Sequence, residues 1–175
     1  MASPIDFKAL IRDVPDFPKP GILFRDVTPL LGNGPAFRAC IRQLCERIAA
    51  HRPQMIAGIE SRGFIFGANV AVELGIGFIP IRKPGKLPWK TRQERYALEY
   101  GTDAIEVHED ALAAGTRVAL VDDLLATGGT AGAAIKLLQH LDGQVVAAAF
   151  VIELKFLEGR SRLGDVPAEV LISYA

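Results

Sequence analysis

The sequence contains little cysteine: Cys40 and Cys45 are the two cysteines among 175 residues, and they form no CxxC pair. At that spacing in a helical pattern they do not share one face, and no histidine is paired with them. Small secreted domains carry more cysteines, and zinc sites repeat their ligands at characteristic spacings. We therefore expect neither a disulfide framework nor a thiolate metal site, but reduced thiols in a cytoplasmic protein.

Long hydrophobic runs are also missing. The longest wholly apolar run, Val145–Ile152, is far shorter than the ~20 residues that a membrane-spanning helix requires. The first residues, MASPIDFK, lack the basic stretch followed by an apolar stretch that marks a secretory signal. The sequence therefore predicts no membrane partner.

Neither sign of charge is in excess, because 20 Lys and Arg balance 20 Asp and Glu. Nucleic-acid binding usually requires a basic excess, so no nucleic-acid partner is expected. The distribution is uneven, however, since Glu94 alone opposes six cations between positions 82 and 95. These cations are Arg82, Lys83, Lys86, Lys90, Arg92 and Arg95. A basic segment in a neutral protein indicates a small anionic ligand.

Apolar runs and helical periodicities alternate along most of the chain. Strands are predicted at Met55–Ile59, Ile76–Ile81, Arg117–Val121, Val145–Ile152 and Glu169–Tyr174, and helices at Pro35–His51, Phe64–Leu74 and Gly129–Leu141. Strands separated by helices indicate a single α/β domain over residues 1–175, with a central, mainly parallel sheet flanked by helices. Ligands of such sheets bind at the carboxyl ends of the strands.

The remaining segments are less regular. Prolines make Asp13–Gly21 extended or turning, and a short helix is expected before it at Ile5–Ile11. The polar stretch Lys83–Arg95 is interpreted as a long loop beside an anionic site, which is typical of a lid. Tyr96–Tyr100 and Ala104–His108 are expected to form the short strands of a ribbon.

The strongest local chemistry lies in Val118–Thr130, which reads VALVDDLLATGGT. The strand should deliver Asp122 and Asp123 to the sheet edge, where sugar hydroxyls or a hydrated Mg²⁺ would relieve their repulsion. The Ala126–Thr130 turn opens a helix, so its backbone N–H groups and hydroxyls form a cradle for an anion. A sugar phosphate carries both groups. An ordinary strand–turn–helix connection capped by threonine is the alternative.

This segment resembles the phosphoribosyl-pyrophosphate (PRPP) motif of the type I phosphoribosyltransferases, and its DDLLATGGT wording most resembles the adenine-specific members. FPKPGILFRDVTPLL, IAGIESRGFIFG, IPIRKPGKLP and YALEYGTDAIEVHEDAL resemble further segments of that family in the same order. The resemblance implies a homodimer with a hood at residues 1–34 and a lid region at 83–103. It implies conversion of adenine and PRPP to AMP and pyrophosphate with Mg²⁺. A 6-oxopurine transferase and a non-catalytic PRPP or nucleotide sensor remain alternatives.

The resemblance also implies roles for individual residues. The 5′-phosphate site comprises Ala126, Thr127, Gly128, Gly129 and Thr130, and the ribose and Mg²⁺ site comprises Asp122 and Asp123. The pyrophosphate site comprises Ser61, Arg62, Arg82, Lys83 and Lys86, with Arg62 also catalytic. A forked guanidinium and backbone donors suit a diphosphate whose charge must be stabilised as it leaves.

Adenine recognition is expected at Leu23, Phe24 and Arg25. Phe24 could stack on the base, while backbone groups around it read the 6-amino edge and reject a 6-oxo purine. Without the family, Phe24 would be interpreted as a core residue. The resemblance places Glu99 near the purine, where a carboxylate could assist loss of the N9 proton, and gives Tyr100 a role in the lid.

Overall fold

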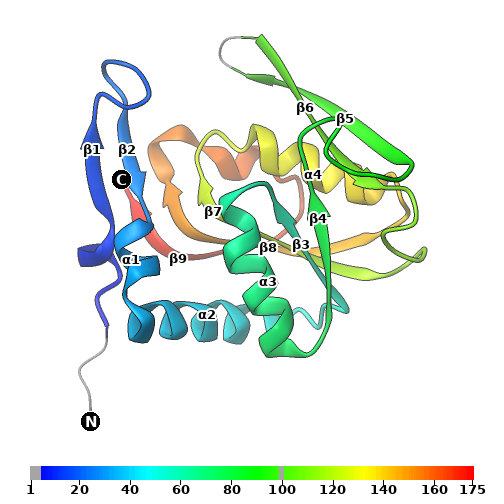
Figure 1. The fold of residues 1–175 in the computed structure, drawn as a ribbon, viewed down its shortest axis with the longest axis horizontal. Coiled ribbons are helices and arrows are strands. Elements are labelled where there is room, and N and C mark those ends of the chain that lie inside the picture. The colour runs from blue at the N-terminus through cyan, green and yellow to red at the C-terminus, as the bar shows by residue number, and fades with distance from the viewer. Residues whose placement is uncertain (1–4, 99–100) are drawn as a thin grey trace.

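A computed structural model describes residues 5–98 and 101–175 and is built around a parallel sheet of five strands in the order β4-β3-β7-β8-β9 (Figure 1). These strands are β3 (Met55–Ile59), β4 (Gly77–Ile81), β7 (Arg117–Leu125), β8 (Gln144–Leu154) and β9 (Ala168–Tyr174). Every neighbouring pair runs parallel. The predicted central parallel sheet is therefore confirmed.

Helices cover both faces of this sheet (Figure 1): α2 (Gly34–Ala49) and α3 (Arg62–Leu74) lie against one face and α4 (Gly129–Gln139) against the other. The Asn33 side chain accepts a hydrogen bond from the Ala36 amide (3.1 Å) and so caps the start of α2. Gly75 ends α3 in the left-handed conformation, with a φ of 67°. These features explain why the predicted helix boundaries are close to those observed.

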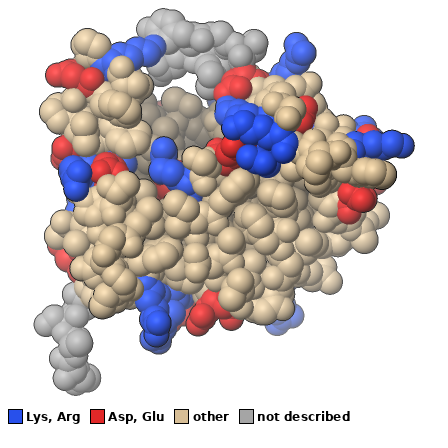
Figure 2. Space-filling model, viewed as in Figure 1, with Lys and Arg blue, Asp and Glu red and all other residues tan. Residues whose placement is uncertain are grey.

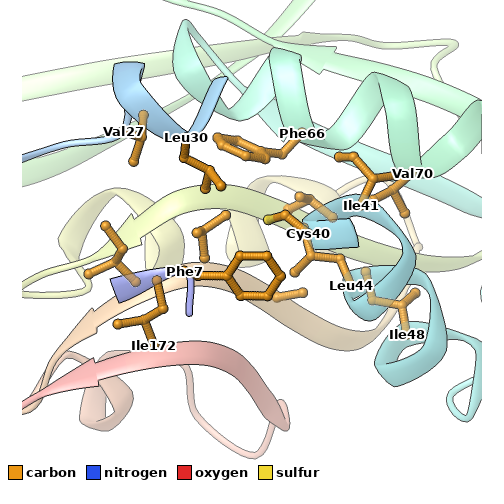
Figure 3. Packing of buried hydrophobic residues seen from close by; sticks show 14 of the residues in the cluster. Phe7, Val27, Leu30, Cys40, Ile41, Leu44, Ile48, Phe66, Val70 and Ile172 are labelled. Carbon is orange, nitrogen blue, oxygen red and sulfur yellow. The ribbon is translucent and has the colours of Figure 1, made fainter. Parts of the chain in front are cut away.

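Two hydrophobic cores follow from the alternation of side chains along the buried strands. On β7, Ala119 and Val121 belong to the core beneath α2 and α3, whereas Val118 and Leu120 belong to the core beneath α4. Figure 3 shows the first core, in which Phe66 of α3 lies beside Leu30 of α1, and Ile172 of β9 lies on the far side of the cluster. The central strands are therefore buried on both sides.

The connections around the sheet diverge between β3 and β7. From β3 the chain crosses through α3 to β4 on one side, whereas from β7 it crosses through α4 to β8 on the other side. Because α3 and α4 cover opposite faces, a crevice opens at the carboxyl ends of β3 and β7, where doubly wound sheets bind ligands.

Two antiparallel hairpins flank this crevice (Figure 1). The first pairs β1 (Arg12–Pro15) with β2 (Leu23–Asp26) and leads into α1 (Thr28–Gly32), and the second pairs β5 (Thr91–Leu98) with β6 (Gly101–His108). Three short 3₁₀ turns complete the described chain: η1 (Lys8–Leu10), η2 (Lys155–Leu157) and η3 (Gly159–Arg162).

Three expectations about element boundaries were wrong. The predicted loop Lys83–Arg95 ends where β5 begins at Thr91, because its polar residues pair with β6. The strand predicted to stop at Val121 continues to Leu125, so the acidic pair lies within a strand whose residues still pair with β8. The helix expected at Ile5–Ile11 shrinks to the single turn η1.

Candidate active site

A cavity of about 360 Å³ lies at the carboxyl ends of β3 and β7. Its lining consists of Ile59–Arg62, Lys83, Tyr96, Asp103 and the continuous stretch Asp122–Ala131. Figure 2 shows a hollow between the β1–β2 and β5–β6 hairpins, with basic and acidic side chains next to one another around it. The structure therefore brings the predicted acidic pair, the predicted phosphate turn and part of the predicted pyrophosphate site into one cavity.

Two helices begin at this cavity without a side-chain cap. Ser61 precedes α3 and Gly128 precedes α4, and neither position supplies a side-chain hydrogen bond to the helix start. The first N–H groups of a helix have no partner within it, and the helix dipole adds a partial positive charge there. Both helix starts can therefore bind anions, in contrast to α2, whose start is capped.

The two helix starts differ in their backbone. At α3 the Glu60–Ser61 peptide bond is cis, in the segment expected to form the pyrophosphate loop. At α4 the N-cap Gly128 has a φ of 77°, and a Cβ there would stand 2.2 Å from the carbonyl oxygen of Gly159. Glycine is thus required both by the left-handed backbone and by the neighbouring chain.

The acidic pair lies in two different environments. Asp123 is buried and forms an ion pair with Nε of Arg62. Asp122 accepts a hydrogen bond from the Asp123 amide (2.9 Å), and burial together with the charge of Asp123 raises its pKa well above the usual range. The wall of the cavity therefore holds one carboxylate that is neutralised by arginine and a second that is poorly stabilised as an anion.

Glu60 organises the basic segment that follows β4. Its carboxylate accepts hydrogen bonds from Nζ of Lys86 (2.7 Å), from Arg82 (3.2 and 3.3 Å) and from the Lys83 amide (3.1 Å). These donors, the Lys86 bond foremost, lower the pKa of Glu60 to about 2. Arg82 and Lys86 do not line the cavity themselves but are tied to a residue that does. Glu60 has no role among the sequence-based predictions, although an acidic residue at a strand end followed by a basic segment is a usable signal.

Asp103 and Tyr96 are further cavity residues that the sequence analysis missed. Nζ of Lys83 forms an ion pair with Asp103 and donates a hydrogen bond to the Tyr96 hydroxyl (3.2 Å). Although burial opposes the charge of Lys83, the hydrogen bond to Asp103 raises the pKa of this ammonium group. The register of the β5–β6 hairpin pairs Tyr96 directly with Asp103, and the sequence pattern alone did not reveal that register.

The segment expected to bind adenine lies beside this cavity without forming its wall. The ring of Phe24 is half-buried and packs edge-on against Phe17, with the Arg62 guanidinium 5.4 Å from its centroid. The side chain of Arg25 turns away, because it forms an ion pair with Asp13 and lies 3.8 Å from the centre of the Tyr174 ring. Leu23 is exposed. Contact with a base would therefore use the Phe24 ring and backbone groups of β2.

The remaining sequence-based expectations concern the two cysteines, Glu99, Tyr100 and metal ligands. Cys40 and Cys45 are free and buried, and burial raises their pKa values to about 12 and about 11. Glu99 and Tyr100 lie outside the described residues. Within residues 5–98 and 101–175, the acidic, histidine and cysteine side chains form no cluster of three that could hold a metal ion.

We expect the Glu60 cluster to contribute stability that depends on pH. A carboxyl whose pKa falls from 4.5 to about 2 on folding stabilises the fold fully above pH 4.5, and this contribution disappears as the pH falls through 2. The denaturant midpoint of Glu60→Gln should therefore lie below that of the wild type at pH 7, and the gap should narrow between pH 4.5 and 2. Glu46→Gln, which removes an exposed carboxyl of α2, is the control. A gap that stays constant across this range would contradict the expectation.

The chain is similar to known proteins over nearly its whole length. The family model for the phosphoribosyl transferase domain matches residues 30–168. An adenine phosphoribosyltransferase of Rhodospirillum centenum is 55% identical over 170 residues, which cover 97% of this chain and 99% of that protein.

Solved structures give the same result. The crystal structure of adenine phosphoribosyltransferase from Thermoanaerobacter pseudethanolicus superposes with a TM-score of 0.94 at 49% identity, covering 96% of this chain and 98% of the other. The Saccharomyces cerevisiae enzyme, complexed with an imino-altritol bisphosphate and adenine, gives 0.89 at 41% identity and covers 94% and 96%.

Proposed function

The chain belongs to the phosphoribosyl transferase family and, within it, to the adenine phosphoribosyltransferases, and on that premise we propose how its residues carry out the reaction. The enzyme joins adenine to the phosphoribosyl group of PRPP, giving AMP and pyrophosphate in purine salvage. The observation that carries the residue assignment is that two uncapped helix starts open onto one cavity at the switch point of the sheet.

Each end of PRPP carries a phosphate group that suits one helix start. The 5′-phosphate would lie in the turn before α4, on the residues Ala126, Thr127, Gly128, Gly129 and Thr130. The diphosphate would lie at the start of α3, on Ser61 and Arg62, with Arg82, Lys83 and Lys86 as additional cations. Asp122 and Asp123 line the cavity on β7, the strand that leads to the start of α4. The ribose hydroxyls would bind to these two carboxylates.

The bond between ribose C1′ and the diphosphate oxygen breaks while N9 of adenine forms the new bond, and the N9 proton must leave. Positive charge develops on the sugar and negative charge on the leaving diphosphate, so fixed cations and exclusion of water lower the barrier. Phe24 would stack on adenine near Arg62, with backbone groups of Leu23 and Arg25 reading the edge of the base. Glu99 would assist the proton and Tyr100 would help to close the lid.

A magnesium ion fits this cavity through the substrate. The described residues form no metal cage, whereas Mg²⁺ characteristically keeps several waters and binds one or two carboxylates together with substrate phosphates. Asp122 and Asp123 would supply those carboxylates, directly or through water. When bound, the ion neutralises charge on the diphosphate, and it would favour the ionised form of Asp122.

The test is AMP formation from adenine, PRPP and Mg²⁺, with hypoxanthine as the competing base. We expect AMP from adenine and little inhibition by hypoxanthine, because a donor–acceptor mismatch leaves buried polar groups unpaired. Efficient use of hypoxanthine would favour a 6-oxopurine transferase. Binding of PRPP without any AMP would favour a sensor and overturn the proposal.

The proposal also includes a single domain over residues 1–175, with an N-terminal hood at 1–34 and a lid region at 83–103. The enzyme would act as a cytoplasmic homodimer. Exposed Ile65 and Val72 on α3 supply apolar surface for a second copy. No helix among the described residues has the length and hydropathy of a membrane span. In the same preparation, sedimentation should give twice the chain mass of 18.9 kDa, and a monomer would contradict the dimer.

A further inference from the structure

The chain that follows β8 packs, backbone to backbone, against the turn before α4. A Cβ on Gly159 of η3 would stand 2.2 Å from the carbonyl oxygen of Ala126 and 3.1 Å from the amide nitrogen of Gly128. Slightly farther along, a Cβ on Gly132 would stand 2.6 Å from the carbonyl oxygen of Arg162. Three glycines thus allow η3 to support the turn and the first residues of α4 without an intervening side chain.

A salt bridge fixes this support to the sheet. Arg160 donates two parallel hydrogen bonds to the carboxylate of Glu153 on β8, of 2.6 and 3.0 Å, and a third to the carbonyl oxygen of Ala168 on β9 (3.2 Å). The Glu153 side chain is 4% exposed and also accepts a hydrogen bond from Ser173 (3.2 Å). Arg160 thereby links η3 to two strands at once.

The geometry distinguishes this pair from an ordinary surface ion pair. A bidentate guanidinium bond fixes both distance and orientation, whereas a single contact between exposed chains does neither. Removal of Arg160 would leave the buried Glu153 carboxylate without its main partner, and η3 would lose these two hydrogen bonds to β8. Gly159 precedes Arg160 in sequence and packs against the Ala126–Gly128 turn. A shift of η3 would therefore displace that turn.

We propose that Glu153 and Arg160 are positioning residues for the 5′-phosphate of the substrate. They hold the Gly159 backbone beneath the Ala126–Gly128 turn, so that the N–H groups at the start of α4 converge on one anion. This inference rests on the proposed function, because it assumes that the turn binds the 5′-phosphate. Neither residue lines the cavity, so neither touches the substrate.

The test compares Arg160→Gln with two other variants and uses ribose 5-phosphate and pyrophosphate as separate probes. Arg160→Gln should weaken ribose 5-phosphate binding and raise the KM for PRPP by about tenfold, with pyrophosphate binding and the KM for adenine within about twofold. Arg160→Lys keeps the charge but not the bidentate geometry, so its ribose 5-phosphate affinity and its KM for PRPP should lie between those of Arg160→Gln and the wild type. It also keeps the test decisive if Arg160→Gln fails to fold. Arg47→Gln, which breaks the Arg47–Glu169 pair of α2 and β9, is the matched control and should change neither probe.

Two results would overturn the inference in an active enzyme. One is unchanged ribose 5-phosphate binding in both Arg160 variants, and the other is equal weakening of ribose 5-phosphate and pyrophosphate, which would indicate general loosening. Failure of the proposed function would look different, because the wild-type protein itself would then form no AMP.

Discussion

Replacing Asp123 by asparagine should lower kcat/KM for PRPP by about 100-fold, because the transition state loses a charged acceptor and a correctly placed guanidinium. Asp123 is buried on the cavity wall and holds Nε of Arg62, the residue proposed to contact the diphosphate. Asparagine keeps the size of the side chain but cannot neutralise arginine. The substitution therefore affects the sugar and the leaving group together.

Steady-state kinetics with adenine in excess would measure this loss, and a thermal unfolding curve would show that the variant stays folded. Arg62 is 42% exposed, so water can solvate it when its partner is lost, and the cost in stability should be modest. Asp110→Asn, at an exposed turn outside the cavity lining, is the matched control. Full activity of Asp123→Asn would remove this residue from the site.

Gly128→Ala should abolish detectable PRPP binding, which is the largest effect that we expect from one methyl group in this protein. The left-handed backbone at Gly128 costs a non-glycine residue roughly 1 kcal/mol. The added Cβ would also meet the carbonyl oxygen of Gly159 at 2.2 Å, which is backbone and cannot rotate away. The turn must therefore move away from η3, and the N–H groups at the start of α4 move with it.

Gly115→Ala separates these two contributions. Gly115 has the same φ of 77° as Gly128, but its Cβ would meet nothing within 4 Å. We expect Gly115→Ala to lower the free energy of unfolding only by the cost of placing alanine in a left-handed backbone. It should bind PRPP like the wild type. Titration of PRPP into each variant, together with denaturant unfolding, measures both effects. Equal behaviour of the two variants would show that contact with Gly159 is unimportant.

Sequence patterns predicted the centre of the sheet well because the central strands β3 and β7 are largely buried. Met55–Ile59 is a short apolar run between polar segments, and the predicted limits coincide with those of β3. The β5 strand was predicted poorly, because Thr91–Arg95 is polar and pairs with Ala104–His108 across the hairpin. Local composition identifies buried strands, whereas exposed ribbons are defined by register.

The same difference applies to the site. Asp122, Asp123 and the Ala126–Thr130 turn lie within one short stretch of sequence, so a sugar-phosphate site could be predicted from that stretch alone. The ion-pair partners of the cations could not be predicted in this way, because the Arg62–Asp123 and Lys83–Asp103 pairs join residues from different strands and loops. Glu60 illustrates the limit: its lowered pKa arises from groups that reach it only in the folded chain.

The contact between Gly128 and Gly159 also sets when a newly made chain can complete the proposed 5′-phosphate site. During synthesis, the turn before α4 leaves the ribosome 31 residues (128 to 159) before the segment that supports it. Arg160 then needs the Ala168 carbonyl of the last strand to complete its bonds. A nascent or prematurely ended chain would thus display the whole proposed phosphate motif without the backbone that shapes it. We expect such incomplete chains to leave cellular PRPP unbound, so that substrate is captured only by finished enzyme.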